Sequence, residues 1–305
     1  SKLNLYSLAL ASLLTIAFFT SYSSEKSTAT SSNTATRILP QMVKSPSLDR
    51  EFSFAGEALP LHNFDVRERL DRELNSNTYF HSNLILNLKK ANKYFPTIEP
   101  ILAEEGVPED LKYIAVAESS LTNATSPAGA KGFWQFMKGT SAEMGLEING
   151  EVDERYHLEK ATRAACKYLK KLHARHGSWS AVAAAYNMGS GRLNSEMTKQ
   201  RADNYYDLNL NAETMRYVFR IVALKTIMED PGAFGFYLEA EDLWQPLPDA
   251  YAVEVTGAVE NLGDFANKYG TTYRMIKIYN PWLRSSKLTN ARRKTYQVRV
   301  PRQKF

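Results

Sequence analysis

Glu118 is the only charged residue in the segment 114–129. Helical periodicity places it on the same face as Leu111, Ile114 and Leu121, so its carboxyl group would lie in an apolar stripe. Removal from water disfavours the ionised form and raises the pKa of a carboxyl group, which can then donate a proton near neutral pH. The alternative is a structural Glu that pairs with an Arg or caps a backbone amide.

Three later segments are unusual for a simple helical domain. Residues 126–137 read S-P-A-G-A-K-G-F-W-Q-F-M, in which the glycines permit a tight backbone path and the aromatic and amide side chains suit a sugar. Residues 183–191 read A-A-A-Y-N-M-G-S-G, where a small-residue helix ends in Tyr-Asn before the glycines. Residues 211–218 read N-A-E-T-M-R-Y-V, and we expect both Glu213 and Tyr217, one helical turn apart, to face the buried side. Ordinary packing or capping explains much of each segment alone.

In this order and spacing, the four segments resemble the lytic transglycosylases of the goose-type lysozyme fold, over roughly residues 98–230. The chain is similar in particular to the membrane-bound D type, which also carries C-terminal LysM modules. The resemblance implies that Glu118 is the single catalytic acid and base. It also implies that seven side chains surround the glycan groove: Ser126, Gln135, Met137, Tyr186, Asn187, Glu213 and Tyr217.

Glycoside hydrolysis ordinarily uses two carboxylates, and only one is indicated here. The resemblance implies that Glu118 protonates the glycosidic oxygen between N-acetylmuramic acid and N-acetylglucosamine. The same residue would then take the proton of the C6 hydroxyl group, which closes a 1,6-anhydro ring without water. Two alternatives stay open: a hydrolytic lysozyme of the same fold, which would need a carboxylate to position water, and a non-catalytic protein that only holds cell-wall glycan.

Metal and cofactor sites are not expected. The five His residues form no H-E-x-x-H or comparable pattern. The single Cys, Cys166, excludes an internal disulfide and a Cys-rich metal site.

The elements that must position these residues are mainly helical. From Phe64 onward, apolar residues recur at intervals of three and four, for example within 158–172 and 217–228. The sequence predicts a mainly α, lysozyme-like catalytic domain over residues 64–245, with the motif core at 98–230. Helix breaks are expected at Pro96, Pro108, Pro127, Gly177 and Pro231.

Residues 250–305 predict a separate β-α-α-β module. Strands are expected at 251–255 and 295–301, with helices at 261–270 and 272–281 between them. The stretches F-A-N-K-Y-G-T-T, I-Y-N-P and V-R-V-P resemble a degenerate LysM domain, a glycan-binding module. The Gly-Asp-Thr-Leu sequence that usually opens such a domain is absent, so a packing module without a ligand is the alternative.

The N-terminal residues indicate export. An apolar run over residues 5–20 is followed by a small-x-small site at Ser21 and Ser23, so residues 1–23 predict a signal peptide. An uncleaved membrane anchor is the alternative. Residues 24–63 are rich in Ser, Thr, Ala and Pro and predict a flexible tether.

The charge of the chain does not indicate nucleic acid as a partner. The net charge of +5 comes from Lys and Arg spread along the sequence rather than from a dense basic block. The expected partner is the glycan strand of peptidoglycan, in the periplasm or cell envelope. Membrane association through the N-terminus follows if the anchor is retained.

Overall fold

The computed structural model of the 305-residue chain describes residues 43–303. Apart from Val43, these residues belong to one compact unit, Lys44–Phe305. The signal peptide or anchor predicted over residues 1–23, and the predicted tether as far as residue 42, lie outside the described residues. None of the helices found in the described part is long and apolar enough to cross a bilayer.

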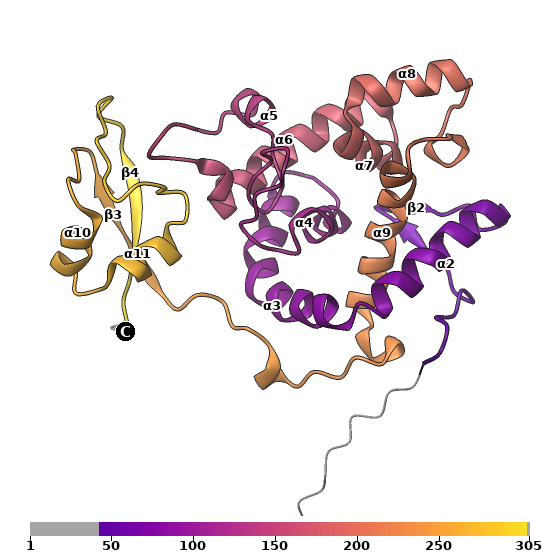
Figure 1. Ribbon diagram of the computed structural model, residues 1–305, viewed down its shortest axis with the longest axis horizontal. Helices are drawn as coiled ribbons and strands as arrows, with labels where there is room; N and C mark the ends of the chain where they lie inside the picture. The colour runs from indigo at the N-terminus through magenta and orange to yellow at the C-terminus, as the bar shows by residue number, and fades with distance from the viewer. Residues whose placement is uncertain (1–42, 304–305) are drawn as a thin grey trace, which may run out of the picture. The chain divides into compact units, whose positions relative to one another are not determined.

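Helices make up most of the described chain as far as residue 245. They are α2 Phe64–Thr78, α3 His81–Glu104, α4 Lys112–Ser119, α5 Lys138–Glu143, α6 Leu158–His176, α7 Trp179–Met188, α8 Ser190–Gln200 and α9 Ala212–Glu229. Figure 1 shows α4 at the centre of this helical part, with α3 below it and α9 beside it. Helix α4 packs against α3 and α9, α9 against α2 and α7, and α6 against α3 and α7. The helix that carries Glu118 is therefore surrounded by other helices.

The predicted helical periodicity is confirmed by burial. In α6, Ala161, Ala165 and Leu172 are buried on one face, and the helix ends at Gly177 in the left-handed conformation. In α9, the buried face includes Ile221. Such stripes meet in one hydrophobic cluster, and their burial is the main force that holds the helices together.

The helix break predicted at Pro96 is wrong. Helix α3 continues through Pro96 and Pro100 to Glu104. A proline inside a helix costs about 3 kcal/mol because it removes a hydrogen bond and crowds the preceding turn. Ala91 and Ile98, on either side of Pro96, are buried in the core, and this packing offsets the cost.

A short hairpin lies where the sequence predicts a tether. Strands β1 Ser53–Phe54 and β2 Glu57–Ala58 pair in antiparallel fashion. Phe54 and Leu59 are buried in the helical core. The tether prediction over residues 24–63 is therefore wrong for this stretch, because its apolar side chains gain the burial that a flexible segment lacks.

The C-terminal module has the predicted β-α-α-β order. Strands β3 and β4 pair antiparallel, with Ala250 opposite Pro301 and Val255 opposite Tyr296. Side chains of β4 alternate between buried and exposed up to its last residue, as expected for a strand with one face on a core. The elements are β3 Ala250–Val255, α10 Leu262–Lys268, α11 Tyr273–Tyr279 and β4 Tyr296–Pro301. The predicted fold class, mainly α with a small β-α-α-β module, is confirmed.

The hydrophobic cluster of the C-terminal module includes two residues from the helical part of the sequence. Val152 and Tyr156 are buried with Trp282 and Leu283. Val152 forms a β-bridge with Leu283, and the backbone amide of Asp153 donates to the carbonyl oxygen of Trp282 at 2.9 Å. The turn at 152–156 thus lies in the helical part of the sequence but packs into the core of the C-terminal module.

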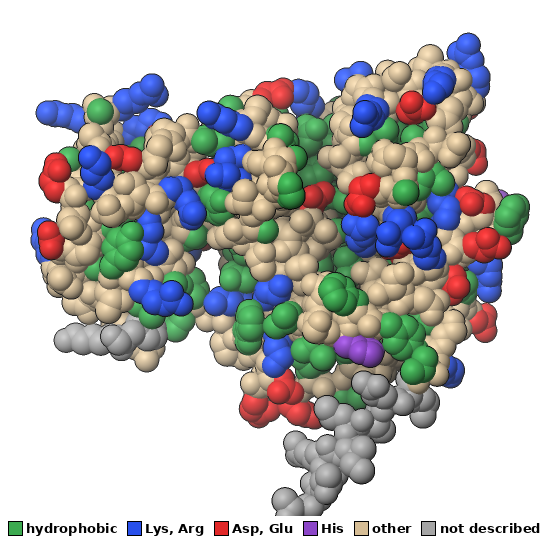
Figure 2. All heavy atoms as spheres, viewed as in Figure 1, with side chains coloured by type: hydrophobic (Ala, Val, Ile, Leu, Met, Phe, Trp, Pro, Cys, Tyr) green, Lys and Arg blue, Asp and Glu red, His purple; other side chains and the backbone are tan. Residues whose placement is uncertain are grey.

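Charged side chains do not gather in one block on the face shown in Figure 2. Lys and Arg side chains are spread over this face, with Asp and Glu among them. This distribution agrees with the sequence, in which basic residues occur along the whole chain.

Candidate functional site

Glu118 lies in the last turn of α4 and is partly accessible to solvent. The hydroxyl group of Tyr217, on α9, donates a hydrogen bond to Glu118 Oε1 at 2.5 Å. Tyr217 is buried, as are Leu111 and Ile114 near the start of α4. Leu121 is also buried, but it follows the end of the helix rather than continuing its face.

The pKa of the Glu118 carboxyl group is raised to about 7, mainly by burial. The hydrogen bond from Tyr217 and the positive charge of Arg220 act in the opposite direction, and the negative charge of Glu213 adds to the increase. Glu118 is therefore half protonated near neutral pH, which is the property required of a general acid.

The segment 126–137 forms a tight lobe after α4. Gly132 has a φ of +80° and packs so closely on the turn at 152–156 that a Cβ there would lie 1.9 Å from the carbonyl oxygen of Arg155. Only glycine fits this position, because it has no Cβ and readily adopts a positive φ. The prediction of a tight backbone path after α4 is confirmed.

Three predicted site residues, Ser126, Gln135 and Met137, lie within this lobe. The hydroxyl group of Ser126 accepts a hydrogen bond from the amide of Ala130 at 3.0 Å and closes a short loop. The side-chain amide of Gln135 donates to the carbonyl oxygens of Ala124 and Gly132. Met137 is exposed and precedes α5. None of the three makes a hydrogen bond to Glu118 within the described residues.

Tyr186 links the end of α7 to the lobe. Its hydroxyl group donates to the carbonyl oxygen of Trp134 at 2.6 Å. Trp134 is fully buried, and its indole N–H donates to Thr162 on α6 at 3.0 Å. Burial raises the pKa of Tyr186 and of Tyr217, and the charge of Glu118 adds to the increase in both.

Asn187, which follows Tyr186 on α7, connects this helix to the start of α9. Its side-chain oxygen accepts a hydrogen bond from the hydroxyl group of Thr214 at 2.8 Å. Asn211, the N-cap of α9, accepts from the backbone amide of Thr214. The Tyr-Asn pair therefore ties α7 to the lobe on one side and to the start of α9 on the other.

The expectation that Glu213 faces the buried side is wrong. Its side chain is 56% exposed and forms an ion pair with Arg220, with 3.1 Å between Oε1 and the guanidinium nitrogen. Glu213 lies in the first turn of α9 and is exposed there, whereas Tyr217 one turn later is buried.

Arg155 supports the lobe and was not predicted from the sequence. Its guanidinium group donates to the carbonyl oxygens of Gly129 and Phe136 and forms a buried ion pair with Asp153 at 2.8 Å. These contacts support the lobe rather than the reaction. The only signal in the sequence was the run of three charged residues, D-E-R, at 153–155.

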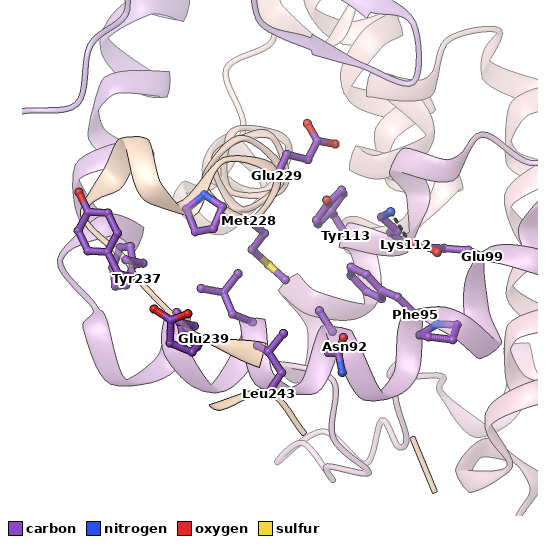
Figure 3. A pocket seen from close by; sticks show the side chains of 16 residues that line it. Asn92, Phe95, Glu99, Lys112, Tyr113, Met228, Glu229, Tyr237, Glu239 and Leu243 are labelled. Carbon is purple, nitrogen blue, oxygen red and sulfur yellow. Dashed lines mark hydrogen bonds and ion pairs between the residues drawn. The ribbon is translucent and has the colours of Figure 1, made fainter. Parts of the chain in front are cut away.

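A separate cavity of about 650 Å³ lies near the start of α4 and the end of α9 (Figure 3). Residues of α3, the start of α4, the end of α9 and the segment 231–243 line it, including Phe95, Tyr113 and Met228. None of the eight predicted site residues lines this cavity. The site around Glu118 is therefore distinct from it.

Two family models match the chain. The model for the transglycosylase SLT domain matches residues 95–209. The model for the soluble lytic transglycosylase C-terminal LysM-like domain matches residues 251–304.

The chain is also similar to individual proteins. It is 26% identical over 246 residues to the membrane-bound lytic murein transglycosylase D of Escherichia coli (strain K12), an alignment that covers 78% of this chain and 53% of that protein. It is 29% identical over 106 residues to a putative tributyltin chloride resistance protein of Alteromonas sp. (strain M-1), covering 34% of this chain and 51% of that protein. The chain thus spans about half the length of these relatives.

A solved structure, the 70 kDa soluble lytic transglycosylase of Escherichia coli, is similar with a TM-score of 0.39 and 22% identity, over 50% of this chain and 26% of that one. The two family matches agree with the order of segments around Glu118 and with the β-α-α-β module. Residues 95–209 of the chain therefore form a domain of the transglycosylase SLT family, and residues 251–304 form a C-terminal LysM-like domain of the kind found in soluble lytic transglycosylases.

Proposed function

We propose that the chain is a peptidoglycan lytic transglycosylase, which cleaves the β-1,4 bond between N-acetylmuramic acid and N-acetylglucosamine and leaves a 1,6-anhydromuramic acid end. The observation that carries the proposal is the Glu118 carboxyl group, with a pKa of about 7 and a hydrogen bond from Tyr217, in a domain of the SLT family. The match to the SLT domain supports the substrate class, and the geometry around Glu118 supports its role as the proton donor.

In the first step, protonated Glu118 gives its proton to the glycosidic oxygen. The bond between this oxygen and C1 of the muramic acid breaks, and N-acetylglucosamine leaves as an alcohol. The positive charge that develops at C1 is stabilised by the acetamido group of the substrate. A carboxyl group that is half protonated at neutral pH suits this step.

In the second step, ionised Glu118 takes the proton of the C6 hydroxyl group, and O6 bonds to C1. Glu118 regains its proton and no water is consumed. Within the described residues, Glu213 is the one other carboxylate that contributes to the pKa of Glu118, and Arg220 already holds it in an ion pair. This supports a mechanism with one carboxyl group over one with two.

The other predicted site residues have supporting roles in this proposal. Tyr217 orients Glu118 and stabilises its ionised form between the two steps. Tyr186 and Asn187 hold the lobe and α9 on either side of it. Gln135, Met137, Ser126 and Glu213 would contact the glycan strand.

The proposal also covers where the protein acts. Export through residues 1–23, as a signal peptide or a retained anchor, would bring the domain to the periplasm and the cell wall. The LysM-like domain would contribute glycan contacts of its own.

The test is product analysis. Purified peptidoglycan is incubated with the wild-type chain and with Glu118→Gln, and the soluble fragments are identified by mass spectrometry. We expect 1,6-anhydro ends from the wild type and none from the variant. Reducing ends would instead identify a hydrolase, and binding of peptidoglycan without any product would identify a non-catalytic protein.

A further inference from the structure

Lys90 is a buried cation next to the end of α4. It lies in the middle of α3, is 6% exposed, and donates from Nζ to the carbonyl oxygen of Ser120. Burial lowers the pKa of Lys90, and no carboxylate in the described residues counteracts this change. A buried charge without a counter-ion lowers stability, so its position needs a reason.

The turn that Lys90 contacts is strained. Ser120 and Leu121 have φ values of +49° and +52°, so two consecutive residues that are not glycine adopt the left-handed conformation. A positive φ is uncommon for such residues, and it is an outlier for a bulky one. Strain of this kind persists only where surrounding contacts hold it, and it concentrates at functional sites.

Two asparagines extend the polar surface of α3 around Lys90. Asn83 accepts a hydrogen bond from the hydroxyl group of Ser120 at 3.1 Å. Asn87 is completely buried, and its side-chain amide has no partner among the described residues. Asn83, Asn87 and Lys90 are spaced by four and three residues, so they share one face of the helix. This set is called the α3 stripe below.

We infer that the α3 stripe positions Glu118 by holding the strained turn at Ser120 and Leu121. Helix α4 spans only Lys112–Ser119, and Glu118 lies in its last turn. Its final backbone bond joins the amide of Ser120 to the carbonyl oxygen of Val116 at 2.8 Å. Helix ends fray unless their free carbonyl groups find partners, and a cation is favourable there because the helix dipole is negative.

This inference rests on the proposed function, since Glu118 must meet the substrate in one position. A displacement of about 1 Å in a reacting group can lower a rate about a hundredfold. Lys90 and Asn83 form hydrogen bonds to Ser120 and none to Glu118 among the described residues, so they are positioning residues that act through the turn.

Lys112 provides a matched control at the other end of α4. It is 7% exposed, and its Nζ lies 2.6 Å from a carboxylate oxygen of Glu99 and 2.5 Å from one of Glu109. Figure 3 shows the bond to Glu99 as a dashed line. Both lysines are buried, Lys112 at the start of α4 and Lys90 at its end, but only Lys90 contacts the end that carries Glu118.

Hydrogen exchange tests the inference without relying on turnover. The exchange rate of the Ser120 amide is measured by NMR in the wild type, Lys90→Met and Lys112→Met. We expect exchange at least tenfold faster in Lys90→Met and within twofold of the wild type in Lys112→Met. Equal rates at Ser120 in the wild type and Lys90→Met would overturn the inference.

Kinetics test the consequence for catalysis. We expect Lys90→Met to lower kcat by about 10- to 100-fold with KM within threefold, because the substrate still binds while the acid is misplaced. Lys112→Met should retain kcat. Glycine adopts a positive φ without strain, so Ser120→Gly in the Lys90→Met background should restore kcat at least threefold.

Asn83→Ala replaces Lys90→Met if the latter does not fold, because Asn83 is partly exposed and its loss disturbs the core less. We expect a kcat about threefold lower with unchanged KM, and faster exchange at Ser120. An unchanged kcat in an active, folded variant would refute the inference. If the wild type forms no product at all, the proposed function fails, and the exchange rates still decide whether the stripe holds the turn.

Discussion

Glu118 and Glu73 are both carboxyl groups that receive a hydrogen bond from α9, but their partners differ in charge. Glu73, on α2, is 1% exposed and accepts from the guanidinium group of Arg216 at 2.6 Å. Glu118 accepts from the hydroxyl group of Tyr217 at 2.5 Å. Arginine is always cationic and stabilises a carboxylate as an ion, whereas a phenol is neutral and leaves the carboxyl group able to hold a proton near pH 7.

The comparison shows how one helix can serve stability and chemistry separately. Arg216 and Tyr217 are consecutive, so their side chains leave α9 about 100° apart and reach different neighbours. Helix α2 receives the ion pair and α4 receives the phenol. One helix therefore supplies a cation to one buried carboxyl group and a neutral hydroxyl group to another.

The largest expected effect is on turnover. Glu118→Gln removes the only proton carrier of both proposed steps, and general acid–base catalysis contributes roughly 10²- to 10⁴-fold to a rate. We expect release of soluble fragments from peptidoglycan to fall about a thousandfold, with an unchanged circular dichroism spectrum. A variant that keeps a tenth of the wild-type rate would show that Glu118 is not this carrier.

The second effect is on folding. Glu73→Gln leaves Arg216 without its counter-ion, and removing one partner of a buried ion pair destabilises a protein by about 3 kcal/mol. We expect the free energy of unfolding in urea to fall by about 2 to 3 kcal/mol, since Arg216 is partly exposed. The kcat of the folded variant should stay within threefold of the wild type. A large loss of kcat with unchanged stability would reverse the roles assigned to the two carboxyl groups.

The third effect is the pH dependence of stability. The pKa of Glu118 is about 7 in the folded chain, against an ordinary value of 4.5. Between these two values the folded state holds a proton that the unfolded state has lost, so the contribution of Glu118 to stability falls as pH rises. We expect the wild type to lose about 2 kcal/mol relative to Glu118→Gln over this interval. If the unfolding free energies of the wild type and of Glu118→Gln changed by the same amount over this interval, the raised pKa of Glu118 would be contradicted.

The smallest effect concerns the phenol itself. The hydrogen bond from Tyr217 lowers the pKa of Glu118, so Tyr217→Phe should raise it further. We expect the alkaline limb of the pH profile of kcat/KM to move to higher pH. Tyr186→Phe is the control, because its hydroxyl group donates to Trp134 rather than to Glu118. A shift of the same size in both variants would mean that the loss of any nearby hydroxyl group raises the pKa of Glu118, whether or not it is bonded to the carboxyl group.

The features that could be predicted from the sequence are those that depend on neighbours along the chain. The helix around Glu118, the helix that carries Tyr217 and the strands of the C-terminal module follow from local periodicity. Gly132 was also recognisable, since glycine marks backbone paths closed to other residues.

The features that could not be predicted depend on contacts between distant parts of the chain. Lys90 and Ser120 are 30 residues apart, and Arg155 reaches Gly129 across 26 residues. No repeat or spacing in the sequence links such pairs. The exposure of Glu213 was missed for a related reason, because periodicity gives a helix face but not how far along the helix its neighbours extend.

The turn at 152–156 has a consequence for dissecting the protein. Val152 and Tyr156 complete the hydrophobic cluster of the C-terminal module, although both precede it by about a hundred residues in the sequence. A polypeptide truncated after residue 245 would expose both side chains to water and would be prone to self-association. The boundary between the two domains in the sequence is therefore not a point at which the chain can be cut without exposing apolar side chains of the helical part. Catalytic fragments should retain the last fifty residues.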